Sequence, residues 1–131
     1  MSKHYLLDTH IILALVESRA GGLPKRMREE IIENTVPVWV SVASLWELAI
    51  KERIGKLPIS TPLGMWPDAL FLLGAQLLEI KLHHVLADIG PEPDTNDPFD
   101  RLLLGTCAAE KFELVTLDRA LSVHPLAWRD R

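Results

Sequence analysis

Five carboxylates of this 131-residue chain stand where an ordinary surface charge is badly placed. Asp8 follows the apolar run YLL and Asp118 follows LVTL, so each comes directly after a predicted buried strand. Glu47 interrupts the apolar face of a predicted helix, where a buried charge is costly unless a partner offsets it. Asp97 opens another predicted helix, and Asp100 heads the apolar stripe of that helix. Carboxylates in such positions are candidates for a catalytic or metal site.

Each of these residues also has a purely structural interpretation. Asp8, Asp97 and Asp118 precede predicted helices and carry a side chain that often caps a helix N-terminus. Glu47 could pair with Lys51 at i+4, a surface interaction worth about 0.3–0.5 kcal/mol. Such a pair does not explain why Glu47 shares a face with apolar residues, which favours a functional role. For the three capping candidates both interpretations stay open.

Together these side chains could bind a hard divalent cation. If they meet at one edge of a sheet, their mutual repulsion raises their pKa values unless a cation lies among them. A ligand set made of oxygen alone suits Mg²⁺ or Mn²⁺, which also accept phosphate oxygens. Zinc is disfavoured, because the His residues and Cys107 show no ligand spacing and the adjacent His83 and His84 are expected to point apart. His10 is expected to pack against its neighbours, with a role beside Asp8 left open.

Other catalytic motifs are missing from the sequence. It contains no Walker-type loop, no GxGxxG and no GxSxG. Cys107 has no partner set that would make it a nucleophile. The four Trp residues are expected in the core or in a protein interface rather than on a base-stacking surface. Glu29, Glu30 and Glu33 are expected to be solvated on one helix face.

Strands alternate with helices along the chain, and this order predicts how the carboxylates are brought together. Strands are expected at 3–7, 36–41, 77–82 and 113–117. Helices are expected at 11–17, 24–34, 42–54, 68–76, 83–89 and 97–110. The segment 58–67 is expected to be a variable loop or a moving lid. The predicted fold is a three-layer α/β/α sandwich with a mostly parallel sheet of four to five strands, which binds ligands at the carboxyl ends of its strands.

Length and composition indicate a single domain over residues 1–131. The net charge of −4 lacks the basic excess that is typical of non-specific nucleic-acid binding, so contact with a nucleic acid needs a local basic patch or a metal ion. The single cysteine cannot form an intrachain disulfide, and no apolar segment is long enough to span a bilayer or resembles a signal peptide. A cytoplasmic protein without membrane contact is expected.

Three segments, taken in order, resemble a known family. They are YLLDTH, VSVASLWELAIKERIGKL and NDPFDRLLLGTCAAEKFELVTLD. The ordered set resembles the PIN-domain family, and within it the VapC-type toxins of bacterial toxin–antitoxin pairs, from the first strand to Asp118. The resemblance implies a compact α/β/α sandwich with a parallel sheet. It also implies Mg²⁺- or Mn²⁺-dependent endoribonuclease activity.

Roles for the carboxylates follow from this resemblance, residue by residue. Asp8 and Asp100 resemble the principal metal ligands, and Glu47 resembles a ligand or a residue that holds a water molecule. Asp118 corresponds to the outer member of the site, and Asp97 to an additional acid of the DPFDR subgroup. The implied reaction is metal-assisted hydrolysis of an RNA phosphodiester bond.

The resemblance implies further residues and partners around these acids. Thr9 and Thr116 would donate hydrogen bonds to the carboxylates. Lys51, Arg101 and Arg119 are close to the acids in sequence and are candidates for contact with RNA phosphates. The implied partners are the RNA substrate, a small VapB-like antitoxin that covers the active-site groove, and a second copy in a homodimer.

Two other functions remain as alternatives. A metal-dependent phosphomonoesterase is opposed by the absence of a DxD pair, because Asp8 is followed by Thr9 and His10. A catalytically silent module that only binds a partner is opposed by the presence of every matched acid. For contacts with partners, the hydrophobic helices and the loop around Trp66 are candidate surfaces.

Overall fold

Four short parallel strands form the central sheet of the computed structural model, which describes residues 3–33 and 35–130. The strands are β1 (Tyr5–Leu7), β2 (Val38–Ser41), β3 (Ala75–Leu78) and β4 (Glu113–Val115). They lie in the order β3-β2-β1-β4, and each neighbouring pair is parallel. An isolated parallel bridge between Leu114 and Ala127 extends the sheet beside β4. The prediction of a mostly parallel sheet of four to five strands is confirmed.

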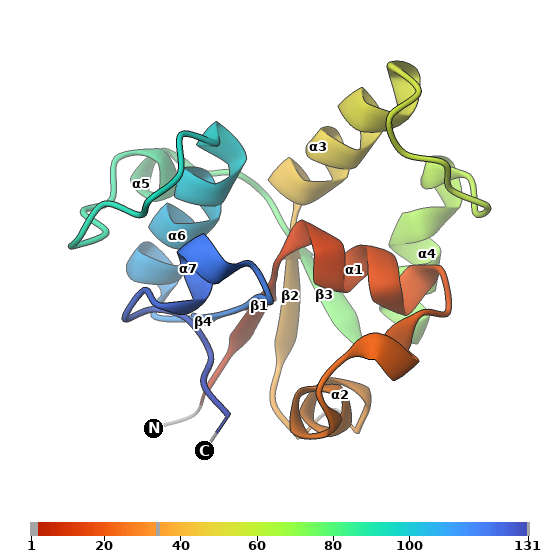
Figure 1. Cartoon of the computed structure of the whole chain (residues 1–131), viewed down its shortest axis with the longest axis horizontal. Helices are drawn as coiled ribbons and strands as arrows, with labels where there is room; N and C mark the ends of the chain where they lie inside the picture. Colours follow the sequence, from red (N-terminus) through yellow and green to blue (C-terminus); the bar gives the residue numbers. More distant parts are fainter. Residues whose placement is uncertain (1–2, 34, 131) are drawn as a thin grey trace.

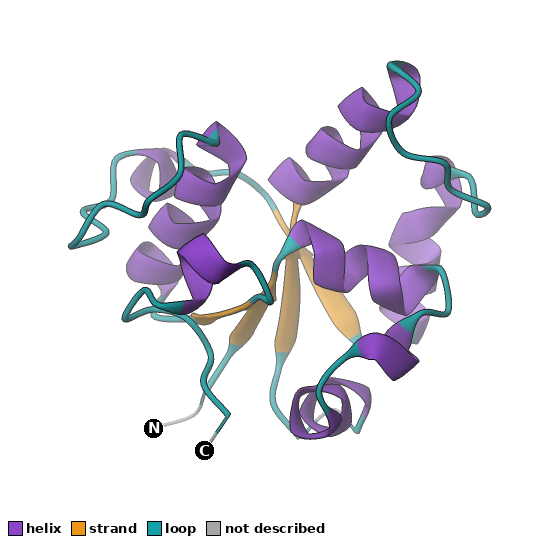
Figure 2. Ribbon diagram, viewed as in Figure 1, coloured by secondary structure: helices purple, strands orange, loops and turns teal. Residues whose placement is uncertain are grey.

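Helices cover both faces of this sheet. They are α1 (Thr9–Val16), α2 (Lys25–Ile32), α3 (Val42–Arg53), α4 (Trp66–Leu72), α5 (Leu82–Val85), α6 (Pro98–Glu110) and α7 (Arg119–Ser122), with 3-10 turns η1 (Ala20–Gly22) and η2 (Leu63–Met65). In Figure 1, α1, α2 and α4 lie on one side of the strands and α5, α6 and α7 on the other, while α3 rises from the end of β2. Figure 2 shows the same three layers by element type. The α/β/α sandwich is therefore confirmed.

The two faces of the sheet carry separate hydrophobic cores, which explains why the short strands are so apolar. Tyr5 and Leu7 of β1 point into one core with side chains of α1, α2 and α4. Leu6, between them, points into the other core with side chains of α6 and α7. All three side chains are buried, as expected for a strand covered on both faces. No helix among the described residues is long and apolar enough to cross a membrane.

The boundaries of the middle elements differ from those predicted. The third strand, expected at 77–82, is Ala75–Leu78, and the helix expected at 68–76 is Trp66–Leu72. Gly74 has a φ of 86°, a left-handed conformation that ends the helical segment and lets the strand begin at the next residue. The alternation of LLEIKL therefore indicated the right strand with bounds that lie too far toward the C-terminus.

Three further expectations need correction or a limit. The segment 58–67 contains the turn η2 and the first two residues of α4, of which Trp66 is fully buried. Its indole N–H donates to the Thr61 carbonyl (2.8 Å), so Trp66 holds this segment to the core, and any partner surface there is formed by other residues of the loop. The helix expected at 83–89 is a single turn, Leu82–Val85. Of the helix expected at 24–34, α2 accounts for Lys25–Ile32, and Asn34 lies outside the described residues.

Glu30 joins three elements and is not the solvated side chain that the helix pattern indicated. Its carboxylate accepts hydrogen bonds from the Tyr5 hydroxyl, the Trp128 indole N–H (3.0 Å) and the Arg26 guanidinium (3.2 Å). Burial would raise the pKa of Glu30, but these donors outweigh burial and hold the pKa below its ordinary value. Glu29 and Glu33 are exposed, as predicted. The pattern of α2 could not reveal this role, since Trp128 is 98 residues away in sequence.

Glu30→Gln is expected to lower the free energy of unfolding by about 1.5–3 kcal/mol, because a neutral amide weakens three hydrogen bonds to a charged acceptor. Urea denaturation at pH 7 measures this change. Because the pKa of Glu30 is depressed on folding, its stabilisation is present above the unfolded pKa and is lost as the pH falls through the folded pKa. Glu29→Gln is the matched control, since the ion pair of Glu29 with Lys25 (3.9 Å) is exposed. Equal effects of the two substitutions would contradict the prediction.

Candidate functional site

Asp8 lies at the carboxyl end of β1, at the edge of the sheet where ligands of parallel α/β folds bind. Its side chain is buried, with 4% exposure. The carboxylate caps α1 by accepting the Thr9 backbone N–H (2.7 Å), and its other oxygen accepts the Thr116 hydroxyl (2.7 Å). The capping interpretation of Asp8 is therefore correct. A cap alone does not require burial or the second donor, which leaves the functional interpretation standing as well.

Glu47 extends from α3 toward the same edge. It is buried, with 6% exposure, and its two oxygens have different partners. The Thr9 hydroxyl donates to Oε1 (2.7 Å), and the Lys51 ammonium donates to Oε2 (2.7 Å). Thr9 thus binds Asp8 through its backbone and Glu47 through its side chain, which fixes the two carboxylates relative to each other. Ser44 Oγ, 3.1 Å from the Thr9 hydroxyl oxygen, completes this contact between α1 and α3.

Asp97 and Asp100 enter the site from the start of α6. Asp97 caps the helix by accepting the Phe99 N–H (2.8 Å), followed by Pro98 at the first helical position. Asp100 lies in the first turn, where the Thr95 hydroxyl donates to its Oδ2 (3.3 Å). The stripe that Asp100 heads is buried as predicted, so the core on one side of the sheet holds the start of α6 in place.

Asp118 reaches the edge from the end of β4 and is exposed. Its carboxylate caps α7 by accepting the Ala120 N–H (2.8 Å). The backbone N–H of Asp118 donates to Thr116 Oγ1 (3.0 Å), and the same hydroxyl donates to Asp8. Thr116 therefore links the chain at Asp118 to the buried carboxylate of Asp8.

The electrostatics of Asp100 show that the carboxylates lie close together. Burial and four neighbouring charges raise the pKa of Asp100 from its ordinary value of 3.8 to about 7. The neighbouring charges, in order of effect, are those of Asp97, Asp8, Asp118 and Glu47. The structure thus brings all five predicted acids to one place, although their distances along the chain reach 110 residues.

The pKa values of two neighbouring groups, Asp8 and Lys51, are also raised. Burial raises the pKa of Asp8, against the opposing hydrogen bonds from Thr116 and Thr9. The hydrogen bond to Glu47 raises the pKa of Lys51, and the charges of Asp97 and Asp100 add to the effect. Lys51 is thus the resident cation beside these acids. It does not neutralise five carboxylates by itself.

The donor set fits a hard divalent cation. Every candidate ligand atom is a carboxylate oxygen, which is what Mg²⁺ and Mn²⁺ prefer. Among the residues that the structure describes, no three of these carboxylates bring one oxygen each to within 4.8 Å of one another. Mg²⁺ keeps several of its water ligands and typically takes only one or two carboxylates directly. It therefore does not require three carboxylate oxygens within 4.8 Å of one another.

Asp100→Asn is expected to stabilise the metal-free protein at pH 8 by about 1–2 kcal/mol, or about 3–6 °C in Tm. A raised carboxyl pKa means that stability is lost as the pH rises from the unfolded value near 4 to the folded value of about 7, and asparagine removes this loss. The full shift would correspond to about 4 kcal/mol, and partial exposure of Asp100 reduces it through solvent screening. Thermal melts in EDTA at pH 5 and pH 8 test this, with little difference expected at pH 5. A less stable variant at pH 8 would contradict it.

The three cations predicted to contact RNA differ in their contacts and in their exposure. Lys51 is held by Glu47 and is 37% exposed. Arg101 Nη2 lies 3.7 Å from Glu92 Oε1, in an exposed pair of little energetic weight. Arg119 is the first residue of α7 and is exposed. Their role toward a phosphate stays a prediction.

The prediction that His83 and His84 point apart is wrong. Nε2 of His83 (3.0 Å) and Nε2 of His84 (2.6 Å) both contact Glu110 Oε2. Nδ1 of His84 accepts the Lys81 backbone N–H (3.1 Å), so the proton of the neutral ring lies on Nε2 and is donated to Glu110. A nitrogen that donates its proton cannot ligate a metal at the same time, and His84 is buried. The group therefore joins α5 to α6 as a structural contact.

His10 also differs from expectation. It is exposed on α1 and does not pack into the core. Its charge lowers the pKa of Asp8, against the dominant effect of burial. Its place beside the site leaves a role in ligand contact open.

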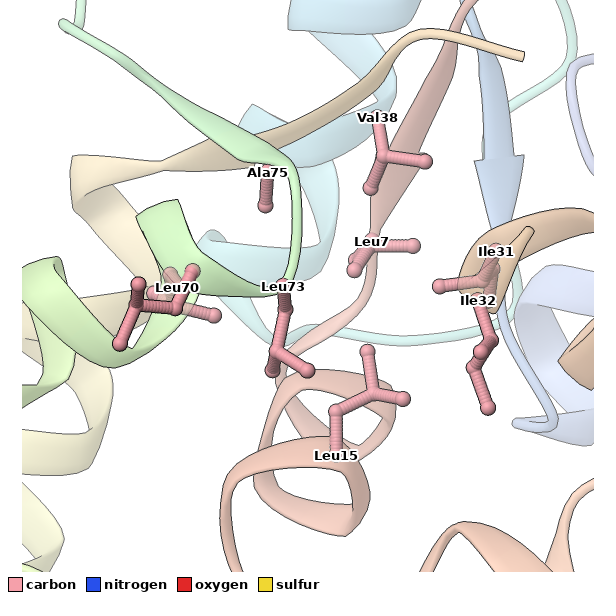
Figure 3. A pocket seen from close by; sticks show the side chains of 9 residues that line it. Leu7, Leu15, Ile31, Ile32, Val38, Leu70, Leu73 and Ala75 are labelled. Atoms are coloured by element: carbon pink, nitrogen blue, oxygen red, sulfur yellow. The ribbon is translucent and has the colours of Figure 1, made fainter. Parts of the chain in front are cut away.

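An apolar cavity of about 250 Å³ has none of the five carboxylates in its lining (Figure 3). Only aliphatic side chains line it, contributed by α1, α2, α4 and the strands that they cover. Leu7, Leu15, Ile31 and Leu70 are among those that point into it in Figure 3. It offers no titratable group, so the candidate site is the carboxylate cluster.

Two aromatic side chains border the cluster and were missed by the sequence analysis. Trp46 is 56% exposed and so does not lie in the core, whereas its expected place in a protein interface stays a prediction. Its ring meets that of Phe99 edge to face, with centroids 5.3 Å apart. Each directly precedes a site acid in the chain, Glu47 and Asp100, and that adjacency is the signal by which they could have been found.

Comparisons with known proteins agree with this architecture. The family model described as PIN domain matches residues 5–125. Among solved structures, the fold is similar to that of VapBC2 from Rickettsia felis bound to a DNA fragment from their promoter, with a TM-score of 0.58 and 16% sequence identity over 94% of this chain and 94% of that chain. At this identity the likeness concerns the fold alone. A search of curated proteins gave no significant match.

Proposed function

The chain belongs to the PIN-domain family, as its three motifs indicated, and on that premise we propose that it is a Mg²⁺- or Mn²⁺-dependent endoribonuclease, the toxin of a VapBC-type toxin–antitoxin pair. One observation supports this above the others. Asp8 and Glu47 are buried at the carboxyl edge of the sheet, and the charges of Asp97, Asp8, Asp118 and Glu47 add to burial in raising the pKa of Asp100. A partly buried cluster of like charges destabilises a protein, so its presence favours a function that needs it.

In this proposal the chain's own residues hold the metal and the substrate. When bound, Mg²⁺ or Mn²⁺ polarises the scissile phosphate and makes water a stronger nucleophile. Asp8 and Asp100 hold the ion, Glu47 orients a water molecule, and Asp118 and Asp97 complete the outer part of the site. Thr116 keeps the Asp8 carboxylate in a fixed orientation through its hydroxyl, and Thr9 does the same for Glu47.

The same charges explain why the ion would be required for RNA binding. Five carboxylates repel a polyanion, and the net charge of −4 supplies no general attraction. A divalent ion reverses the local sign of the field. Lys51, Arg101 and Arg119 would then contact phosphates on either side of the cleaved bond.

The proposed partners are a VapB-like antitoxin and a second copy of the chain. The similar structure from Rickettsia felis is a VapBC2 complex, which supports an antitoxin partner for this chain without locating its binding site. An antitoxin segment that covers the carboxylate groove would block the substrate. Action on cellular RNA would require a cytoplasmic location.

The decisive experiment incubates the purified chain with total bacterial RNA and maps new 5′ ends, with Mg²⁺, with Mn²⁺ and with EDTA. Cleavage with either ion and none with EDTA is expected. Turnover of a small phosphate monoester without RNA cleavage would favour the phosphomonoesterase. Absence of both activities, together with no heat of metal binding by calorimetry, would favour a silent partner-binding module.

A further inference from the structure

The aromatic pair formed by Trp46 and Phe99 lies beside the carboxylates, on the helices that carry them. Trp46 directly precedes Glu47 in α3, and Phe99 directly precedes Asp100 in α6, so each ring starts from a Cα about 3.8 Å from that of a site residue. In Figure 1 the start of α6 and the start of α3 stand on either side of the carboxyl ends of the strands. The edge-to-face contact of the two rings joins α3 and α6 at residues next to Glu47 and Asp100 in the chain.

The indole of Trp46 differs from the other three in its hydrogen bonding. The N–H groups of Trp39, Trp66 and Trp128 donate to His4, Thr61 and Glu30, respectively. Within the described ranges 3–33 and 35–130, no acceptor is found for the N–H of Trp46. A tryptophan that is needed only for packing is usually buried and bonded. Trp46 instead offers an unused donor and an exposed ring to a ligand.

The geometry of the pair leaves a surface for stacking. The two ring planes meet at 75°, so whichever ring presents its edge, at least one face of the indole is not covered by Phe99. Exposure of 56% of Trp46 makes such a surface accessible from solvent. Aromatic faces bind nucleobases of any sequence without adding positive charge. This suits a site in which Lys51, the nearest cation, already pairs with Glu47.

We propose that Trp46, supported by Phe99, stacks on an unpaired nucleobase next to the scissile phosphate and so positions single-stranded RNA in the site. This inference rests on the endoribonuclease function proposed above. Trp46 is then a positioning residue, which holds the base while the carboxylates and their ion act on the phosphate. A stack of this kind requires an unpaired base, so the preferred substrates are single-stranded segments and loops rather than duplexes.

The test measures binding of a labelled single-stranded oligoribonucleotide of mixed sequence by fluorescence anisotropy, in Mg²⁺, with phosphorothioate linkages in the RNA to suppress cleavage, so that every residue proposed to hold the ion stays intact. Under these conditions, Trp46→Leu is expected to weaken RNA affinity about 5- to 150-fold, the range of one stacked base. Trp46→Phe keeps an aromatic face and is expected to retain most of the affinity. Phe71→Leu is the matched control, since it removes an aromatic ring from α4 that is more exposed (77%) than Trp46 (56%) and is expected to change nothing.

A second readout separates stacking from a merely structural effect. Replacing single nucleotides of the oligoribonucleotide by abasic ones is expected to weaken binding at one position when Trp46 is present. With Trp46→Leu the same replacement is expected to have no further effect, because the base has already lost its partner. In the cleavage assay of the otherwise wild-type chain, Trp46→Leu raises KM more than it lowers kcat.

Each outcome is distinguishable. If the unaltered chain cleaves RNA and Trp46→Leu binds and cleaves as well as it does, the stacking inference is wrong while the proposed function stands, and the pair is then a contact for a protein partner. Loss of affinity with Trp46→Phe equal to that with Trp46→Leu would also overturn it. If the unaltered chain neither cleaves RNA nor binds the phosphorothioate oligoribonucleotide in Mg²⁺, both the function and the inference fail.

Discussion

Asp8→Asn and Asp100→Asn are each expected to lower Mg²⁺-dependent RNA cleavage by at least about 100-fold, while the domain stays folded. Changing a residue that merely orients a metal ligand typically costs 10- to 100-fold, so loss of a ligand itself costs more. Asparagine keeps the size of aspartate and one acceptor oxygen, so the cap to the Thr9 N–H can persist at Asp8, while the amide NH2 would donate to the Thr116 hydroxyl instead of accepting from it. Single-turnover cleavage of a mapped RNA site measures the loss.

The control for these variants is an acid of the same type outside the cluster. Asp94 is exposed in the loop before α6, and Asp94→Asn is expected to retain full cleavage. Circular dichroism of every variant checks the fold, and for Asp100→Asn the Tm in EDTA at pH 8 is expected to rise. Loss of activity together with a gain of stability would be hard to explain by unfolding. Cleavage at the unaltered rate in both Asp8→Asn and Asp100→Asn would refute the assignment of the site.

Why the sequence predicts the sheet so well can be argued from the strand ends. YLL of β1 and the residues Leu114 and Val115 of β4 are apolar on both faces because helices cover both faces, and a polar residue follows each strand where the sheet reaches its edge. Ser41 ends β2 in the same way and caps α3 by accepting the Ala43 N–H (3.0 Å). These features are local, so order and type of the elements follow from them. The bounds of β3 do not follow from local features, because they depend on a turn at Gly74 that the alternation of LLEIKL does not encode.

The placement of the acids was predictable for a related reason. Asp8, Asp97 and Asp118 each cap a helix that begins at the same edge of the sheet. The sequence signal for a helix cap therefore also indicates a residue near that edge. What the sequence could not show are the contacts made across the fold. Glu30 receives its donors from both ends of the chain, and His84 meets Glu110 only because α5 packs on α6. The exposure of Trp46 likewise depends on which face of α3 meets α6.

Gly105→Ala is expected to destabilise the protein by about 3 kcal/mol or more, although alanine is the better helix former. Gly105 lies in the middle of α6, where α5 crosses it. A Cβ atom added there would overlap the backbone carbonyl oxygen of His84 and approach Ala87. A side chain could rotate away, but a carbonyl oxygen moves only if α5 moves, and α5 is fixed by the bond from His84 to Glu110 (2.6 Å). The gain in helix propensity, about 1 kcal/mol, is smaller than this penalty.

Urea denaturation measures this effect, and Gly22→Ala provides the matched control. Gly22 lies in η1, has no neighbouring atom within 4 Å of an added Cβ and does not need a positive φ, so alanine there is expected to change stability by less than about 1 kcal/mol. Because Asp97 and Asp100 open the helix that Gly105 belongs to, the destabilised protein is also expected to lose cleavage activity at temperatures where α5 detaches. A variant as stable as the unaltered chain would mean that α5 can shift freely on α6, and the close approach at Gly105 would then have no part in holding the site.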